Sequence, residues 1–285
     1  YTTVHSKQVA WEHNNHWKKY PKNPILGGKF GTIFDVSVLK IDKVFYMFSS
    51  WRPKRNIALS TSIDGLNFTP PINVLSSNTH ILNRPSVIYK GGKFHLWYTM
   101  QNKTGSYINY ATSKTGKNFN VKSKIPVITP KEIWEKTNVM CPHVIWDNDE
   151  NIYKMLYSVI ELYEPDAIGY AISQDGIIWE KYKENPIFKP DPTNNWEKVK
   201  VSACHVMKRK KDYLMFYIGY ENVNLARIGM AKSQNGISNW VKFKNNPIIK
   251  PTEKSWDSDS TYKPSAILDD KRWKLYYNDR RGLLV

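Results

Sequence analysis

No apolar run in this chain of 285 residues approaches the ~20 residues that a membrane-spanning helix needs, so no membrane span is expected. Cysteine is scarce, and Cys141 and Cys204 stand near the starts of corresponding segments. A disulfide would require their Cβ atoms to meet. We instead expect two buried free thiols in a reducing compartment, and therefore a cytoplasmic protein. Long amphipathic helical patterns are also nearly absent, which argues against a helical solenoid.

Acidic residues are few beside basic ones: 25 Asp and Glu stand against 42 Lys and Arg, a formal net charge of +17. Such an excess favours anionic partners, which include nucleic acid, a phosphorylated metabolite and an acidic glycan. No DNA- or RNA-binding module accompanies it, and the lysines are scattered as on a solvated surface. Solubility is therefore the first interpretation of these lysines, and nucleic-acid binding is not expected.

The sequence repeats itself. Residues 168–179 read IGYAISQDGIIW and are followed by Asn-Pro-Ile at 185–187, and a second copy occupies residues 228–240 with Asn-Pro-Ile at 246–248. Weaker copies lie at 57–68 and 108–119. Self-similarity at a fixed period indicates a repeat architecture. The Asp-Gly or Asn-Gly pair within the motif is best explained as turn chemistry.

A second repeated piece is a short apolar strand that precedes an aromatic-rich strand. The apolar strands start at 35, 84, 141, 203 and 263, and the strands after them at 44, 94, 153, 213 and 273. Units of short strands spaced by roughly 50 to 60 residues favour a β-propeller over a sandwich. We predict one all-β domain over 1–285, a five-bladed β-propeller with blades near 30–76, 77–130, 131–190, 191–251 and 252–285 plus 1–29.

The last predicted blade lacks outer strands of its own. Residues 17–25, WKKYPKNPI, resemble residues 179–187, WEKYKENPI, which belong to an outer strand. We therefore expect the N-terminal segment to complete the fifth blade and close the ring, which removes an open sheet edge.

Functional residues of a propeller are expected where the inner strands begin and the loops between the second and third strands return. Because side chains alternate along a strand, residues two apart point the same way. The first tier then contains Asp35, Arg84, Cys141, Ala203 and Lys263. The second tier contains Ser37, Ser86, His143, His205 and Ser265. The loops add polar and basic residues, chiefly Arg52, Arg55, Gln101, Glu161, Glu221, Asp279 and Arg280.

Each candidate also has a structural interpretation. Asp35 with Arg84 and Lys263 is equally compatible with a structural ion-pair cluster and with catalysis. A hydrogen-bonded structural role is preferred for His143 and His205 over metal ligation, because no carboxylate joins their tier. Loop carboxylates such as Glu161 and Glu221 are usually solvated, yet they follow corresponding strands. Arginine suits bidentate binding of carboxylate or phosphate, so the face is expected to bind an anion.

The repeat of Ser-x-Asp-Gly-x-x-Trp with Asn-Pro-Ile, together with the Pro-Ser/His-Val inner strand, resembles the five-bladed β-propeller glycoside hydrolases. This clan includes the arabinanases, xylosidases, invertases and levansucrases, and the chain resembles a divergent member similar to families 43 and 32. The resemblance implies an Asp on the first inner strand as base or nucleophile, and Asp35 matches it. Arg84 stands where the family has a second Asp, and Met140 stands where it has the general-acid Glu.

The resemblance and the residues together predict a carbohydrate-active enzyme of glycoside hydrolase type that acts on an anionic or phosphorylated glycan. Asp35, Glu161 and Glu221 are the predicted catalytic residues, and the charges of Arg84 and Lys263 are expected to keep Asp35 ionised. The predicted substrate-binding residues are Arg52, Arg55, Arg84, Gln101, His143, His205, Lys263, Asp279 and Arg280. No cofactor or metal is expected. The alternatives are a non-catalytic saccharide-binding propeller and a glycoside phosphorylase that uses inorganic phosphate.

Overall fold

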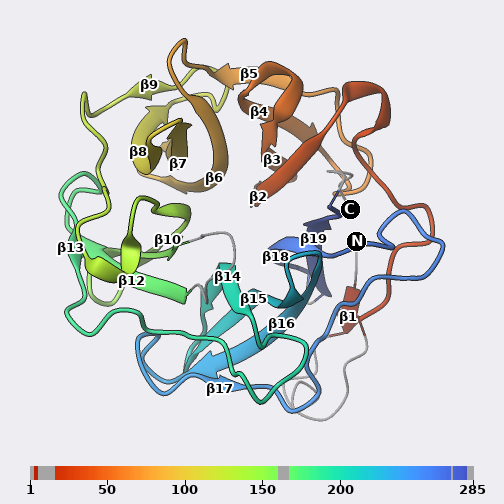
Figure 1. Cartoon of the computed structure of the whole chain (residues 1–285). Helices are drawn as coiled ribbons and strands as arrows, with labels where there is room; N and C mark the ends of the chain where they lie inside the picture. Colours follow the sequence, from red (N-terminus) through yellow and green to blue (C-terminus); the bar gives the residue numbers. More distant parts are fainter. Residues whose placement is uncertain (1–2, 6–16, 160–166, 271, 281–285) are drawn as a thin grey trace.

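The computed structural model describes residues 3–5, 17–159, 167–270 and 272–280, and in these ranges the chain forms antiparallel sheets and no α-helix. Figure 1 shows the sheets arranged around a common centre. The strands nearest to it are β2 (Ile33–Ile41), β6 (Ile81–Lys90), β10 (Met140–Asp147), β14 (Lys200–Lys208) and β18 (Tyr262–Asp269). The predicted all-β propeller is confirmed. No helix among the described residues is long and apolar enough to cross a membrane.

Each inner strand pairs with the strand that follows it in the chain. These second strands are β3 (Val44–Trp51), β7 (Lys93–Asn102), β11 (Ile152–Val159), β15 (Tyr213–Asn222) and β19 (Arg272–Asn278). The third strands are β4 (Asn56–Ser62), β8 (Gly105–Ser113), β12 (Ala167–Ser173) and β16 (Leu225–Ser233). The outermost strands are β5 (Ile72–Leu75), β9 (Asn120–Val121), β13 (Glu180–Lys181) and β17 (Val241–Lys242). Three short 3-10 helices join them: η1 (Gly28–Phe30), η2 (Arg52–Lys54) and η3 (Ile133–Glu135).

Four sheets are complete four-stranded blades, rather than the five that the repeat predicted. The remaining sheet has three strands in the order β1 (Thr3–His5), β19 and β18. Its third strand therefore comes from the N-terminus, through pairs such as Thr3 with Lys274. Residues 17–25, predicted as its outer strand, contribute only an isolated bridge at Lys19. The corresponding strands β13 and β17 have only two residues each, so even in a complete blade the outermost strand forms few backbone hydrogen bonds.

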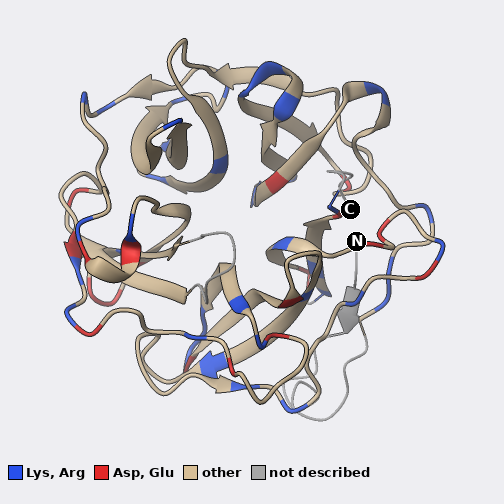
Figure 2. Ribbon diagram, viewed as in Figure 1, with Lys and Arg blue, Asp and Glu red and all other residues tan. Residues whose placement is uncertain are grey.

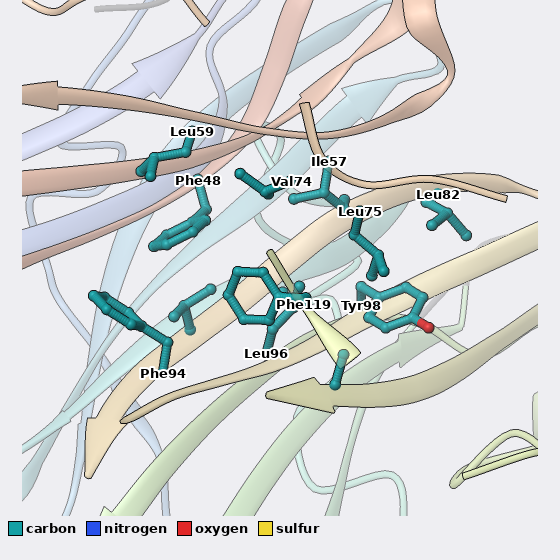
Figure 3. Packing of buried hydrophobic residues seen from close by; sticks show 12 residues of the cluster. Phe48, Ile57, Leu59, Val74, Leu75, Leu82, Phe94, Leu96, Tyr98 and Phe119 are labelled. Atoms are coloured by element: carbon teal, nitrogen blue, oxygen red, sulfur yellow. The ribbon is translucent and has the colours of Figure 1, made fainter. Parts of the chain in front are cut away.

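The hydrophobic core lies between neighbouring sheets. Figure 3 shows Phe48 of β3 packed toward Phe94 of β7 and Phe119, which precedes β9. The ring centroid of Phe48 lies 5.8 Å from that of Phe94 and 5.8 Å from that of Phe119, both in edge arrangements. Aromatic residues of this kind favour strands and fill the space between two sheets. The high aromatic content of the chain thus serves the packing of blade against blade.

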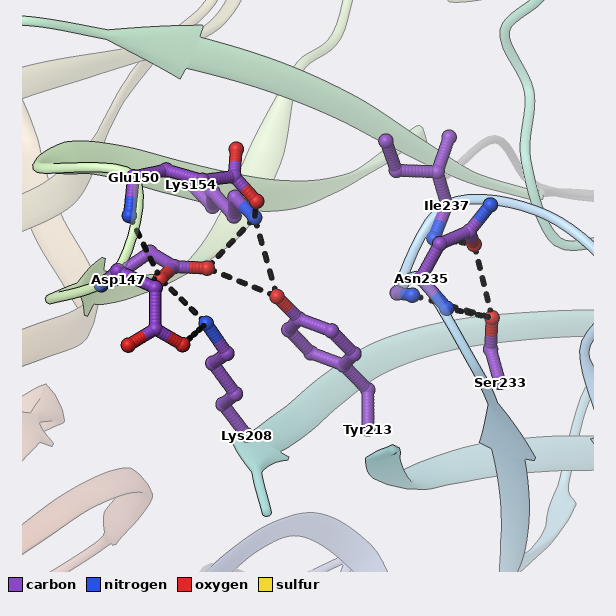
Figure 4. Close-up of polar contacts among 10 residues, drawn as sticks. Asp147, Glu150, Lys154, Lys208, Tyr213, Ser233, Asn235 and Ile237 are labelled. Carbon is purple, nitrogen blue, oxygen red and sulfur yellow. Dashed lines mark hydrogen bonds and ion pairs between the residues drawn. The ribbon is translucent and has the colours of Figure 1, made fainter. Parts of the chain in front are cut away.

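The repeated Ser-x-Asp/Asn-Gly motif forms the turn that follows β4, β12 and β16, and Ser-Lys-Thr-Gly at 113–116 takes its place after β8. In the copy drawn in Figure 4, Asn235 Oδ1 accepts hydrogen bonds from the backbone N–H groups of Ile237 and Ser238. Ser233 Oγ accepts the N–H of Gly236, whose φ of 74° is open to glycine at no steric cost. Asp175 makes the corresponding bonds in another copy. The motif therefore shapes turns and lies away from the inner strands.

Candidate active site

A β-bulge occurs near the start of every inner strand. The register of each inner strand with its partner shifts at this point, and one residue there has a positive φ between 39° and 53°. These residues are Asp35, Arg84, Cys141, Ala203 and Lys263. A non-glycine residue in the left-handed region is uncommon and persists only where its surroundings hold it. The five residues are the first tier predicted from the sequence.

Hydrogen bonds from the preceding sheet hold the backbone at these bulges. The N–H of Asp35 donates to Asn278 Oδ1 at 3.0 Å, and the N–H of Arg84 donates to Ser50 Oγ at 2.8 Å. Cys141 and Ala203 donate in the same manner to Thr99 and Ser158. The bulges at Asp35, Arg84, Cys141 and Ala203 are therefore fixed by polar side chains at the ends of second strands. Bulges commonly re-aim side chains next to active sites.

Asp35 lies in a cavity of about 330 Å³, which we call the Asp35 cavity. Residues from the first, second, third, fourth and last sheets of the chain line it: Thr32, Phe34, Asp35, Arg52, Arg84, Cys141, Lys200, Ser202, Ala203, Ile218, Tyr220, Val223, Tyr262, Asn278, Asp279 and Arg280. Small-molecule sites are concave and have a few convergent polar groups, as this one does.

Asp35 and Arg84 form an ion pair within this cavity. Arg84 Nε lies 3.4 Å from Asp35 Oδ2, and Asp35 is only 8% exposed. Burial opposes the positive charge of Arg84, but the neighbouring Cys141 thiol and Asp35 carboxylate raise its pKa. Within the described part of the chain, Asp35 Oδ2 and Arg84 Nη1 are buried atoms that make no hydrogen bond. Unsatisfied buried polar atoms at a cavity wall are free to bind a ligand.

The walls of the Asp35 cavity are predominantly basic. Arg52, Lys200 and Arg280 join Arg84, whereas Asp35 and Asp279 are its carboxylates. Arg52 lies over the ring of Phe34 at 4.9 Å, and Lys200 lies over the ring of Tyr220 at 4.7 Å. These cation–π contacts orient the basic groups along the walls. The net positive charge favours an anionic ligand.

A second cavity of about 620 Å³, here the Arg55 cavity, shares three lining residues with the first, namely Phe34, Arg52 and Arg84. Its other lining residues are Ser50, Trp51, Arg55, Ile81, Leu82, Asn83 and Gln101. None of its lining residues in the described part of the chain is a carboxylate. The two cavities therefore meet at Arg52 and Arg84.

The structure brings most of the predicted site residues to these two cavities. Asp35, Arg52, Arg84, Asp279 and Arg280 line the Asp35 cavity, and Arg55 and Gln101 line the Arg55 cavity. Glu221 lines neither, and its carboxylate is held by Arg227 Nη1 at 2.6 Å. Glu161 lies outside the described residues. The catalytic role of these two glutamates stays a prediction.

The structure does not bring His143 and His205 to Asp35. Both line a third cavity of about 470 Å³ with Trp146, near the end of β10, and Lys210, just after β14, whereas Asp35 lies near the start of β2. His143 Nε2 donates to the carbonyl of Val206 at 2.8 Å, and the two imidazole centroids lie 4.4 Å apart. Burial lowers the pKa of His143 to about 3 and the pKa of His205 well below its usual value. Both imidazoles are thus neutral near pH 7, and His143 has a structural hydrogen bond.

Lys263 is 3% exposed and lines none of these three cavities. The positive charge of Lys263 acts to lower the pKa values of four neighbours, namely Cys141, Cys204, His143 and His205. Cys141 and Cys204 are free and buried, and burial raises the pKa of each thiol. Buried neutral thiols are unreactive, so these cysteines serve packing.

Lys200, Tyr220 and Tyr262 are among the lining residues that the sequence analysis did not select. Tyr220 is the neighbour of Glu221 on β15, and successive side chains of a strand point to opposite faces. Glu221 at the end of β15 was selected from the sequence, whereas the structure places its neighbour Tyr220 in the cavity wall. The apolar and aromatic run of β15 continues up to Tyr220, and this pattern could have indicated that Tyr220, rather than the next residue, faces inward.

No family model matches this chain, and no curated protein matches it either. Solved structures do resemble it. One described as a glycoside hydrolase shares 17% identity over 91% of this chain and 87% of that chain, with a TM-score of 0.74. A thermostable family-43 glycoside hydrolase shares 19% identity over 90% of this chain and 86% of its own, with a TM-score of 0.73.

A β-1,2-mannobiose phosphorylase from Listeria innocua in complex with β-1,2-mannobiose has a TM-score of 0.73 at 14% identity. The match covers 93% of this chain and 94% of the phosphorylase. At these identities the likeness shows the fold, and several of the proteins that have this fold act on carbohydrates.

Proposed function

We propose that this propeller is a carbohydrate-active enzyme that acts on a glycosidic bond of an anionic glycan in the Asp35 cavity. The observation that carries the proposal is the ion pair of Asp35 and Arg84, whose Oδ2 and Nη1 atoms lack hydrogen bonds among the described residues. The excess of basic over acidic residues in the same cavity supports an anionic substrate. The carbohydrate-acting proteins with this fold add further support.

In this proposal Asp35 acts as base or nucleophile. As base it takes a proton from the water that attacks the anomeric carbon, and as nucleophile it attacks that carbon itself. In either case the glycosidic C–O bond breaks and the departing oxygen receives a proton from a second acid. Glu161 and Glu221 remain the proposed donors of that proton. Arg84, Arg52 and Arg280 bind the negative charge of the glycan.

A glycoside phosphorylase is the second candidate. Four basic side chains around one cavity also suit inorganic phosphate, and one of the similar structures is a phosphorylase. Phosphate then replaces water as the nucleophile, and a sugar phosphate is the product. A strict requirement of turnover for added phosphate identifies this reaction, whereas turnover without phosphate identifies hydrolysis.

We also infer that the three-stranded sheet is the fifth blade and that the N-terminal segment closes the ring. The five inner strands contact one another in succession, and β18 contacts β2. Lys19 Nζ binds Asp257 and the carbonyl of Lys250, and Trp17 packs edge-on against Phe216. Deletion of residues 1–25 should therefore lower the thermal stability strongly; an unchanged Tm contradicts closure.

The experiment that tests the function is a screen of acidic oligosaccharides for new reducing ends or sugar phosphates, with Asp35→Asn as the inactive variant. Asp42 in the turn after β2 is exposed and lines none of the three cavities, so Asp42→Asn is the matched control. Tight binding of a glycan with no turnover under either condition supports the non-catalytic alternative.

A further inference from the structure

We propose that the Arg55 cavity is a second sugar subsite, which binds an acidic sugar next to the one that reacts. The substrate is then an oligosaccharide with its negative charge on a residue adjacent to the cleaved bond. This inference rests on the proposed function of the Asp35 cavity and specifies its substrate class.

The two cavities are contiguous. Phe34, Arg52 and Arg84 line both, and Arg52 lies over the Phe34 ring at 4.9 Å. A ligand that fills both cavities therefore passes along Arg52 and Arg84. Successive sugars of one oligosaccharide satisfy this geometry, because the glycosidic linkage places neighbouring rings in contact.

The polar groups of the Arg55 cavity match the chemistry of an acidic sugar. Asn83 is only 4% exposed, and its Oδ1 makes no hydrogen bond in the described part of the protein. Asn83 Nδ2 donates to Gln101 Oε1 at 3.2 Å, which leaves the Gln101 amide N–H groups as donors. Asn83 Oδ1 can therefore accept a sugar hydroxyl, while Gln101 can donate to a ring or hydroxyl oxygen.

The charges point to an anionic group on the same sugar. Arg84 Nη1 is buried without a hydrogen bond, and no described carboxylate forms a salt bridge with Arg52 or Arg55. Guanidinium groups bind carboxylate, sulfate and phosphate through paired N–H donors. A neutral sugar would leave Arg52 and Arg55 without a counter-charge among the described residues. Asn83 Oδ1 needs a hydroxyl donor and the guanidinium groups need an anion. An acidic sugar provides both.

The position of Arg55 is well defined. Its N–H donates to the carbonyl of Arg52 at 3.0 Å, and its own carbonyl accepts the N–H of Leu82 at 3.1 Å. The indole N–H of Trp51 donates to the carbonyl of Phe30 at 2.9 Å, which fixes the other end of η2. The loop that carries Arg52 and Arg55 is thus tied to its neighbours on both sides.

The test compares binding of acidic mono- and oligosaccharides with that of neutral oligosaccharides of equal length on a glycan array. The probes are hexuronate, sulfated and phosphorylated sugars, and the protein carries Asp35→Asn so that turnover does not interfere. In this background Arg55→Gln should weaken binding of acidic oligosaccharides about tenfold or more and change binding of the neutral oligosaccharides little. Lys54→Gln removes an equal charge from η2 outside both cavities and should have no effect.

Two results would overturn the inference. One is equal binding of acidic oligosaccharides by the Arg55→Gln and Lys54→Gln proteins. The other is no preference of the parent protein for acidic oligosaccharides over acidic monosaccharides. Because the readout is binding, these outcomes are separate from failure of the proposed reaction, which shows as unchanged turnover when Asp35 is replaced in the wild-type chain.

Discussion

The phenol of Tyr157 donates a hydrogen bond to Glu135 Oε1 at 2.7 Å, and the Glu135 carboxylate has no solvent exposure. Lys181 Nζ of β13 lies 2.5 Å from the other carboxylate oxygen. The same arrangement of tyrosine, acid and lysine recurs in two further places, as Tyr217, Glu197 and Lys242, and as Tyr277, Asp257 and Lys19. The buried acid joins the second strand of a sheet to an outer segment.

Glu135→Gln should therefore destabilise the protein by about 2 kcal/mol, because the amide retains the shape but loses its charge-assisted bond with Lys181. Urea unfolding measures this change. Glu180→Gln, at the exposed position next to Lys181 on β13, serves as the control and should lie within about 0.5 kcal/mol of wild type. Equal stability of both variants would show that the buried acid is dispensable.

The second buried network surrounds Asp147, as Figure 4 shows. Asp147 has no exposure and accepts hydrogen bonds from Lys154 at 2.7 Å, Lys208 at 2.5 Å and the Tyr213 hydroxyl at 2.8 Å. Burial raises the pKa of Asp147, but these donors outweigh it and hold the pKa well below its usual range. Its ionised form therefore stabilises the fold.

Lys154→Met should cost about 2 to 3 kcal/mol, because it removes one of two cations from a buried carboxylate. Lys210→Met removes an exposed lysine nearby and should change the stability little. Chemical unfolding at pH 7 gives both values. A loss of the same size in the two variants would contradict the role of the network.

The free energy of unfolding is expected to depend on pH in part through His143 and His205, here the central histidines. Their pKa values are lowered in the folded protein, to about 3 for His143, so the unfolded chain binds more protons than the folded chain as the pH falls below about 6.5. Their contribution to stability is complete above about pH 6.5 and is lost progressively as the pH falls below this value. We expect His143 alone to lower the free energy of unfolding by about 2 kcal/mol from pH 7 to pH 5, and His205 to lower it further.

His205→Asn should flatten this decrease, and unfolding measured at pH 7 and pH 5 tests it. His80 provides the control: it lies outside the three cavities, so His80→Asn should retain the wild-type pH dependence. A slope unchanged by His205→Asn would rule out the central histidines as its source.

The fold was largely predictable because the repeat depends on local chemistry. Ser-x-Asp/Asn-Gly turns and alternating apolar strands are specified within a few residues, and they identified the units of the propeller. The number of complete blades was not predictable, because outer strands of two residues leave almost no sequence pattern.

Figure 2 shows Lys and Arg spread over the sheets and their connections, in keeping with the scattered lysines of the sequence.

The site was predictable in part, for a definite physical reason. Alignment of the inner strands located Asp35 and Arg84, but the second tier assumed unbroken alternation along each strand. The bulge breaks that alternation. The hydroxyls of Ser37, Ser86 and Ser265 instead accept backbone N–H groups from the neighbouring inner strand, those of Val87, Val144 and Val38. For this reason the second tier, His143 and His205 included, does not face Asp35.

The most direct test of the central claim measures kcat/KM of the wild-type, Asp35→Asn and Asp42→Asn proteins on an acidic oligosaccharide that the wild type cleaves, with and without phosphate. We predict that Asp35→Asn lowers kcat/KM by about a hundredfold or more, while Asp42→Asn remains within about twofold of wild type. Circular dichroism confirms that each variant is folded. Wild-type turnover by a folded Asp35→Asn protein would contradict the assignment of this cavity as the active site.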